Sequence, residues 1–367
     1  MTQKVNNFIF FFNYTLLKKQ IYGLIIALII ILYFFTGCAT DKDNEVSYPV
    51  VNYISTTFIS EDYIFENESL SAPTAIRNLH KTNDIVVADA NNKCIYIFSE
   101  AGEFKRKFGR VGQGPGEFIR IGYIDVDNED NIYIHDSNNN RMTIFSSVGK
   151  LINTFPLYGY GIKFSITPNR EILVNIPKNG YYFTLYSQQG NLLRNIGLIP
   201  QYNKREDINI TFAEGFPFQD EKGTFFIFLQ HMPYVKKYNA EGELIEEHNI
   251  RKKLPGYDKF DSKYEPPEKY GTGSVLFNLY QEIIFRDGYF YIPKQHTVTA
   301  EKEYVTEFSL YEFDKYFNIS RLLFLKSKVD FDVRTFSIRF EILNKTKEII
   351  MSHYKVPSIT KFIMENK

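Results

Sequence analysis

From residue 49 onward, the chain alternates apolar and polar residues in short runs separated by turns rich in Asn, Asp and Gly. The stretch from Asn83, NDIVVADANNKCIYIFSEAGEFKRKFG, holds three such runs with an Asn-rich turn and a Gly-containing turn between them. Alternation with a period of two residues indicates half-buried β-strands, and the turn residues indicate hairpins. The composition agrees, because 17% of the residues are aromatic, with 34 Phe and 27 Tyr, and both types favour strands.

The same pattern returns along the chain. Clear copies begin at Asp130, Arg170 and Lys222, a looser copy begins at Asp287, and an incomplete copy begins at Lys347. Each copy supplies three strands, named B, C and D here, and a further apolar run, named A, precedes each. The A strands are predicted near residues 72–79, 118–127, 162–167, 212–218, 279–285 and 336–343. A repeat of about 40 to 60 residues is typical of propeller blades. The sequence therefore predicts an all-β fold, a six-bladed β-propeller with four antiparallel strands per blade.

The last copy ends near residue 365 without a D strand. The run PVVNYISTTFI, residues 49–59, precedes the first A strand and has no copy of its own. Because an open array of blades leaves exposed strand edges, we expect this N-terminal strand to join the last blade and close the ring.

The second copy carries the sharpest motif. DSNNNR, Asp136 to Arg141, follows a strand that ends in Asp and resembles the hallmark of NHL-type propeller repeats. FGRVGQGPGEF, residues 108–118, resembles the junction between blades in the same repeats. The chain thus resembles the six-bladed β-propeller lipoproteins of Bacteroidetes over about residues 50–365, most clearly over 83–157. The resemblance implies the fold and a lipid anchor, but no particular ligand.

The glycine-rich stretch within that junction, Gly109 to Phe118, also has to be compared with phosphate-binding loops. A P-loop requires Gly-Lys-Ser/Thr at its end and a helix after it. Here neither Lys-Ser nor Lys-Thr follows, and the next residues, EFIRIGYIDVD, alternate like a strand. We therefore interpret the glycines as a corner between two blades, where Gly tolerates positive φ.

The N-terminus reads as a targeting segment. The apolar run IYGLIIALIIILYFF is about as long as the hydrophobic region of a signal peptide, and FTGC after it resembles a lipobox with Cys38 as the lipidated residue. We expect a lipoprotein signal peptide over 1–37, a flexible tether over 38–48 and the propeller over 49–367, placed on the periplasmic or cell-surface side of the outer membrane. An uncleaved membrane anchor is the alternative. With Cys38 acylated, Cys94 has no disulfide partner.

The loop lengths favour one end of the propeller as the binding face. A–B and C–D turns are short and emerge at one end, the short-turn face. B–C and D–A connections emerge at the other end, the long-loop face, and include all the long loops, which commonly carry function. We predict a protein, peptide or glycan ligand there, facing the candidates Arg110, Gln113, Arg120, Tyr257, Phe260, Tyr264 and Tyr270.

An enzyme is the alternative function, because some six-bladed propellers resembling this one are metal-dependent lactonases or lyases. The acids available near the A strands are Asp125, Asp127, Glu214, Asp220 and Glu282, and three histidines fall near B–C connections, His231, His296 and His353. None has diagnostic metal-ligand spacing, so we expect no cofactor, with Ca²⁺ or Zn²⁺ as the alternative. Convergence of three acids or histidines in the channel mouth would favour an enzyme.

A scaffold within a larger envelope complex is a third possibility. The formal net charge is zero, which does not favour nucleic-acid binding.

Overall fold

Strands make up most of the described chain, which comprises residues 49–59, 69–250, 253, 267–270, 282–293, 304–332, 339–353 and 358–365 of a computed structural model. Four blades are separate four-stranded antiparallel sheets formed by consecutive strands. Their strands are β2 Pro73–Asn78, β3 Ile85–Asp89, β4 Cys94–Phe98 and β5 Phe104–Phe108 in blade 1; β6 Ile121–Val126, β7 Ile132–Asp136, β8 Arg141–Phe145 and β9 Leu151–Pro156 in blade 2; β10 Lys163–Ile166, β11 Ile172–Asn175, β12 Tyr181–Tyr186 and β13 Leu192–Leu198 in blade 3; β14 Gly215–Gln219, β15 Phe225–Leu229, β16 Tyr234–Tyr238 and β17 Leu244–Asn249 in blade 4.

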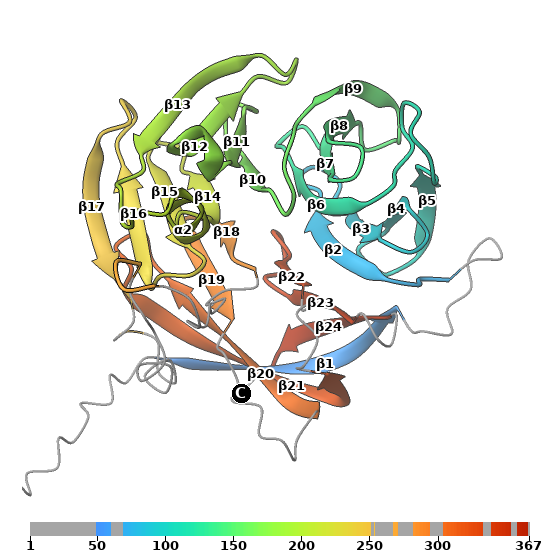
Figure 1. The fold of residues 1–367 in the computed structure, drawn as a ribbon. Helices are drawn as coiled ribbons and strands as arrows, with labels where there is room; N and C mark the ends of the chain where they lie inside the picture. The colour runs from blue at the N-terminus through green and yellow to red at the C-terminus, as the bar shows by residue number, and fades with distance from the viewer. Residues whose placement is uncertain are drawn as a thin grey trace, which may run out of the picture. The chain divides into compact units, whose positions relative to one another are not determined.

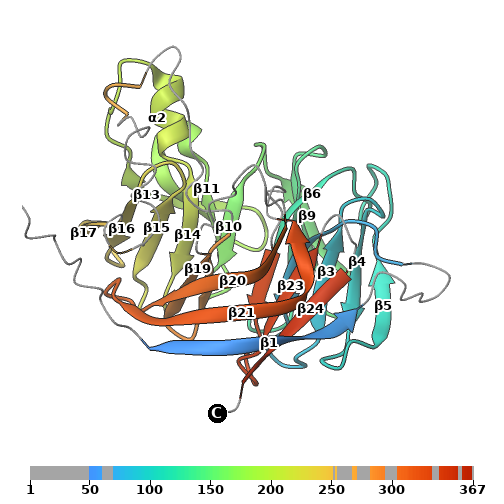
Figure 2. The ribbon, with the colours of Figure 1, turned by 90° about the horizontal axis from the view of Figure 1, so that it is seen from below.

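The N-terminal strand β1, Val50–Ile59, completes blade 6. It pairs antiparallel with β24, as in the D position of the other blades, and its first half also pairs in parallel with β21 of blade 5. Blades 5 and 6 therefore share one eight-stranded sheet, in which β1 lies between β21 and β24 (Figure 2). The remaining strands of this sheet are β18 Ile284–Arg286, β19 Tyr289–Pro293, β20 Tyr304–Phe313 and β21 Ile319–Asp332 in blade 5, and β22 Arg339–Ile342, β23 Ile349–His353 and β24 Ser358–Met364 in blade 6.

Hydrophobic clusters between the blades close the ring. In the described part of the chain six clusters of buried residues occur, and each joins two neighbouring blades, including blade 1 to blade 6 through Ile76, Tyr96 and Ile350. Aromatic rings fill the contact between blades 4 and 5, where Phe228 and Phe290 lie 4.8 Å apart. Figure 1 shows the six A strands, β2, β6, β10, β14, β18 and β22, nearest the centre. The predicted six-bladed β-propeller is confirmed.

A helix ends where the sequence predicts the start of an A strand. Helix α2, Glu206–Phe212, reaches the first residue of the A strand predicted over 212–218, and strand β14 begins only at Gly215. Strand β21 is the longest of the described strands and continues to Asp332. A short 3-10 helix, η1 Pro177–Asn179, lies in the B–C connection of blade 3. The helix was missed because its apolar residues, Ile208 and Phe212, resemble the end of an alternating run, whereas both pack into the core between blades 3 and 4.

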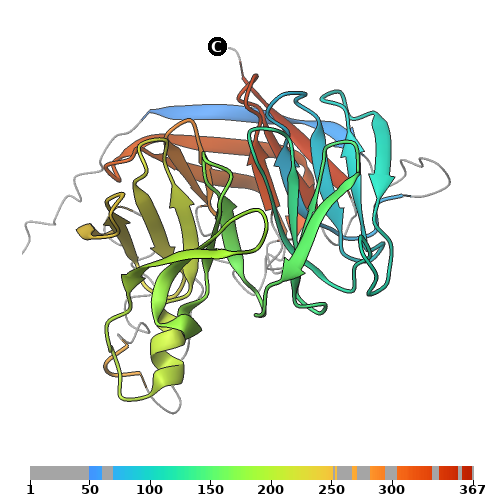
Figure 3. The ribbon, with the colours of Figure 1, turned by 90° about the horizontal axis from the view of Figure 1, so that it is seen from above.

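The two faces of the propeller differ as the loop lengths predicted. Helix α2 follows the D strand of blade 3, and it projects beyond the sheets at the long-loop face (Figure 3). The C–D turns at the opposite face are tight, with Gly102, Gly149, Gly190 and Gly242 each donating to the carbonyl of the residue three positions earlier. No helix within the described residues is both long enough and apolar enough to cross a membrane.

Candidate functional site

The glycine-rich loop is a corner between blades 1 and 2. Gly109, Gly112 and Gly116 have φ values of 84°, 151° and 76°, and a Cβ on Gly109 would lie 2.5 Å from the ring of Phe118. Its N–H groups bond within the loop: Gly112 donates to the Phe118 carbonyl, and Gly114 donates to the carboxylate of Glu117 at 2.8 Å. The loop therefore offers these donors to its own atoms rather than to a phosphate.

The hallmark residues hold backbone in place. The carboxylate of Asp136 accepts hydrogen bonds from the N–H groups of Ile119 and Arg120, where the chain enters blade 2. Arg141 donates to three carbonyls of the glycine-rich loop, those of Gln113, Gly114 and Glu117. Asp136 and Arg141 thus each tie their strand to the junction between blades 1 and 2.

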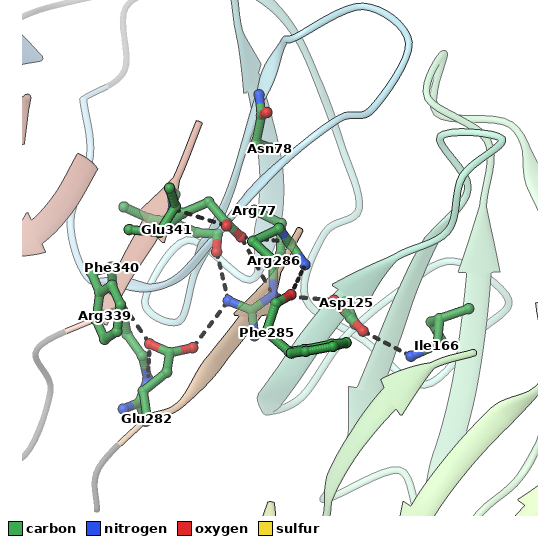
Figure 4. Close-up of polar contacts among 12 residues, drawn as sticks. Arg77, Asn78, Asp125, Ile166, Glu282, Phe285, Arg286, Arg339, Phe340 and Glu341 are labelled. Carbon is green, nitrogen blue, oxygen red and sulfur yellow. Dashed lines mark hydrogen bonds and ion pairs between the residues drawn. The ribbon is translucent and has the colours of Figure 1, made fainter. Parts of the chain in front are cut away.

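A buried charge network lies in the centre of the ring, between blades 1, 2, 5 and 6. Arg77, whose side chain is 2% exposed, donates to Glu282 at 3.0 Å and to Asp125 at 3.3 Å. Arg286 donates to Glu341 at 2.8 Å, and Arg339 lies 4.0 Å from Glu282. Figure 4 shows these side chains converging from different inner strands. Three arginines therefore balance three carboxylates.

Backbone groups complete this network. The N–H of Ile166 donates to Asp125 at 2.8 Å, and the N–H of Ile342 donates to Glu341 at 2.9 Å. Burial disfavours the charge on Arg77, but Tyr123 and the surrounding carboxylates raise its pKa well above the usual value. Burial raises the pKa of Glu341 against the opposing effect of Arg286 and Arg77. The acids here are neutralised by arginines, so they hold neighbouring blades together.

A cavity of about 770 Å³ lies beside the charge network and opens between the A–B turns, on the short-turn face. Arg77 and Arg286 contribute to its lining, together with the rings of Tyr123, Phe164, Phe218 and Phe285. Of the acids proposed from the sequence, Asp125, Asp127 and Asp220 line it. Asp127 and Asp220 accept hydrogen bonds from the backbone of their own A–B turns. This cavity opens at the end opposite to the predicted binding face.

A second cleft, of about 540 Å³, lies on the long-loop face. We call it the Arg120 cleft, and its lining comes from the B–C and D–A connections of blades 1 and 2 and from the first residues of the inner strands β2, β6 and β22. The guanidinium of Arg120 stacks over the ring of Tyr160 at 4.8 Å from its centroid. Among the described residues Arg120 forms no ion pair. Lys93 and Arg339 also line the cleft, and no Asp or Glu of the described residues does.

The other predicted ligand-facing residues lie elsewhere. Arg110 pairs with Glu117 at 2.8 Å in the glycine-rich loop, and neither Arg110 nor Gln113 lines the Arg120 cleft. Tyr270 packs edge-on against Phe212 of α2 at 5.1 Å, so this ring holds its loop against the helix. Cys38, Tyr257, Phe260, Tyr264 and His296 lie outside the described residues.

His231 and Glu214 do not line the cavity beside the charge network. His231 lies 3.4 Å from Glu214, while the side chain of His353 is outside the described part. Within the described residues, no three His, Cys, Asp or Glu side chains are grouped so as to hold a metal ion. Cys94 is buried in strand β4.

Sequence reasoning found Asp125, Glu282 and Arg120 but missed Arg77, Arg286, Arg339 and Glu341. Each missed residue stands in or beside a short apolar A strand, as in PTAIRN and RFEI. A single charge inside an otherwise apolar inner strand is the signal that would have identified them, because such a charge must find a partner in the channel.

The comparisons with known proteins agree with this architecture. Residues 69–263 match the family DUF5128, described as a 6-bladed beta-propeller. The chain belongs to this six-bladed β-propeller family. No curated protein matches the propeller in sequence.

Solved structures resemble the propeller in fold. A putative exported protein from Bacteroides fragilis superposes with a TM-score of 0.53 and 12% identity, covering 87% of this chain and 99% of its own. A member of the DUF4221 family from Bacteroides vulgatus gives a TM-score of 0.52 and 12% identity, covering 88% and 99%. At this identity the likeness concerns the fold alone, so the propeller's function has to be argued from its sites.

Proposed function

We propose that the protein is a lipid-anchored, extracytoplasmic binding module that presents the long-loop face of its propeller to a protein, peptide or glycan. The lipobox-like FTGC after an apolar run supports the anchor. The description of the similar Bacteroides fragilis protein as exported agrees with a location outside the cytoplasm.

The observation that carries the proposal is the contrast between the buried charge network in the channel and the Arg120 cleft. In the channel, Asp125, Glu282 and Glu341 are already engaged by arginines and backbone N–H groups. In the Arg120 cleft, the guanidinium of Arg120 is exposed, stacked on Tyr160 and unpaired with any carboxylate of the described residues. An unpaired, oriented cation on a rigid scaffold is suited to recognition.

Metal-dependent lactonase or lyase chemistry is the less favoured alternative. Three acids do converge in the channel, which would favour an enzyme if they were available. Each of them instead contacts an arginine, so a metal ion or a substrate proton would have to compete with a buried ion pair.

Binding is tested with the full-length chain purified in detergent, immobilised and probed with glycan and peptide arrays and with envelope extract. We expect a ligand whose capture is weakened by Arg120→Ala. Lys150→Ala is the matched control, because it removes one exposed cation from the C–D turn of the same blade on the opposite face. A ligand that both variants capture as well as the wild type would contradict the long-loop face as the binding face.

The anchor is tested separately. Cys38→Ser is expected to remove lipid labelling and to release the protein from the membrane fraction, since thioether acylation requires the cysteine sulfur. Metabolic labelling with an alkyne fatty acid and fractionation measure this. Labelling that persists in the serine variant would contradict the proposed lipobox.

A further inference from the structure

The exposed lining of the Arg120 cleft is positively charged. Lys93, Arg120 and Arg339 contribute to the lining, and Arg339 also lies 4.0 Å from Glu282 of the channel network. Among the described residues, no Asp or Glu contributes to the lining. The nearby acids, Asp89 and Asp136, are fully buried and direct their carboxylates at backbone N–H groups beneath the cleft. A ligand entering the cleft therefore meets cations first, and these favour a negatively charged group.

Irregular backbone also marks this cleft. The pairing of β2 with β3 shifts register at Thr74, and the pairing of β6 with β7 shifts register at Gly122. Both residues line the cleft. The other described A–B strand pairs have no such shift. Bulges are over-represented next to binding sites, where they re-aim side chains.

The register shift at Gly122 places the position of its missing Cβ beside the ring of His135. The backbone of Leu157 interacts with this ring, and no side chain of the described residues bonds to either ring nitrogen. A Cβ placed on Gly122 would lie 3.5 Å from His135 Nδ1, so an oxygen near that position needs to move about half an ångström to reach hydrogen-bond distance. His135 is fully buried, so a hydroxyl that reaches Nδ1 would give this ring a further polar partner.

The remaining polar lining suits a ligand with many hydroxyl groups. Asn91 and Asn138 carry side-chain amides, and Thr74 and Ser137 carry hydroxyls, groups that can donate or accept hydrogen bonds. Several modes of peptide recognition instead rely on apolar pockets or on an open strand edge. Apolar side chains are a minority here. The volume of about 540 Å³ lies within the range of small-ligand sites.

We propose that the Arg120 cleft binds an acidic saccharide, with a sugar carboxylate on Arg120 and a sugar hydroxyl against the Gly122 bulge beside His135. The inference rests on the proposed binding function and adds the ligand class and its orientation.

The test is the affinity of the full-length chain for a trigalacturonate, measured by calorimetry, with the neutral trigalactose and the peptide Glu-Glu-Glu as comparison ligands. We expect the trigalacturonate to bind more tightly than both, with an affinity that falls as NaCl rises. Arg120→Ala is expected to weaken binding by about 10- to 100-fold, because a charged hydrogen-bonding partner is lost. Arg120→Lys is expected to lose less, and Lys150→Ala nothing.

Gly122→Ala tests the bulge. The φ of Gly122 is not positive and the added methyl would meet neighbours at 3.4 Å or more, so the variant is expected to fold. It covers His135 Nδ1 and should weaken trigalacturonate binding by about 3- to 10-fold. An unchanged affinity of Gly122→Ala for trigalacturonate would contradict the placement of a sugar hydroxyl at the bulge.

Different results would contradict the acidic-saccharide site and the binding function. Binding of Glu-Glu-Glu but not trigalacturonate, or trigalacturonate binding unaffected by Arg120→Ala, overturns the acidic-saccharide site while leaving a binding module intact. The absence of any captured ligand in the array and extract experiments contradicts the binding function itself.

Discussion

Arg77 is the residue whose loss should most damage the propeller. Its side chain is 2% exposed and contacts Glu282 and Asp125 at 3.0 and 3.3 Å. Arg77→Met retains most of the volume but leaves Asp125, Glu282 and Glu341 facing only Arg286 and Arg339. Removing one partner of a buried ion pair costs about 3 to 5 kcal/mol, because a charge stays buried without compensation. At about 2 °C per kcal/mol for a large domain, we expect Tm to fall by roughly 6 to 10 °C.

The loss of stability in Arg77→Met should depend on pH, and the direction follows from the carboxylates that lose their cation. A carboxylate that loses its cation has a folded-state pKa above its unfolded value, so the folded state binds more protons and stability falls as pH rises from that unfolded value upward. The direction is already present in the wild type, where burial raises the pKa of Glu341 from 4.5. The Tm deficit of Arg77→Met should therefore be larger at pH 8 than at pH 5.

Thermal unfolding followed by circular dichroism measures both effects. Arg110→Met is the control, because it also breaks an arginine–carboxylate pair, but one whose arginine is 80% exposed, and exposed pairs contribute little. Equal Tm values for the two variants at pH 8, or a deficit that grows as the pH falls, would refute the account of the channel network.

Three further outcomes follow from single residues. Burial lowers the pKa of Lys163 to about 8, so NMR of ¹³C-labelled protein should show its Cε resonance, assigned by loss in Lys163→Met, titrating near pH 8, whereas a midpoint near 10.5 would contradict its burial. The same lowered pKa means the unfolded state binds the extra proton, so the Lys163 contribution to stability should rise between pH 8 and 10.5. Gly109→Ala should destabilise the fold by about 1 to 3 kcal/mol, measured by urea unfolding, because φ is 84° and the new Cβ would overlap Phe118; an unchanged midpoint would contradict the corner interpretation.

Much of the fold was predictable because the propeller repeats a local pattern. Alternation fixes strands such as β7 and β8, in which nearly every residue is buried between blades. The spare N-terminal strand could be placed by counting, and its pairing with β24 confirms that placement. Its parallel pairing with Leu322–Lys326 of β21 was not predicted, since it joins two blades edge to edge and no local turn residue encodes such a contact.

The candidate site was harder to predict because it depends on side chains that meet only in the closed ring. Arg120 was recognised as a basic residue at the start of an inner strand, but Tyr160 beneath it comes from the next blade junction, 40 residues further along the chain. The register shifts at Thr74 and Gly122 cannot be read from the apolar pattern, since the residues around them alternate normally. Partners that far apart are outside the reach of a repeat-by-repeat analysis.

The hydrogen bonds of Asp136 and Arg141 explain why the DSNNNR motif identifies a fold and not a ligand. Asp136 and Arg141 use their polar atoms on backbone groups of the blade junction. Blade 3 lacks the motif, yet Asn175 in strand β11 performs a related task, accepting from the N–H of Gly215 and donating to the carbonyl of Ala213 at the start of blade 4. Because another amide can take over a purely structural role, the motif can be lost while the blade remains, and periodicity is the more reliable guide to the fold. The proposed ligand specificity would then come from residues outside the motif, such as Arg120.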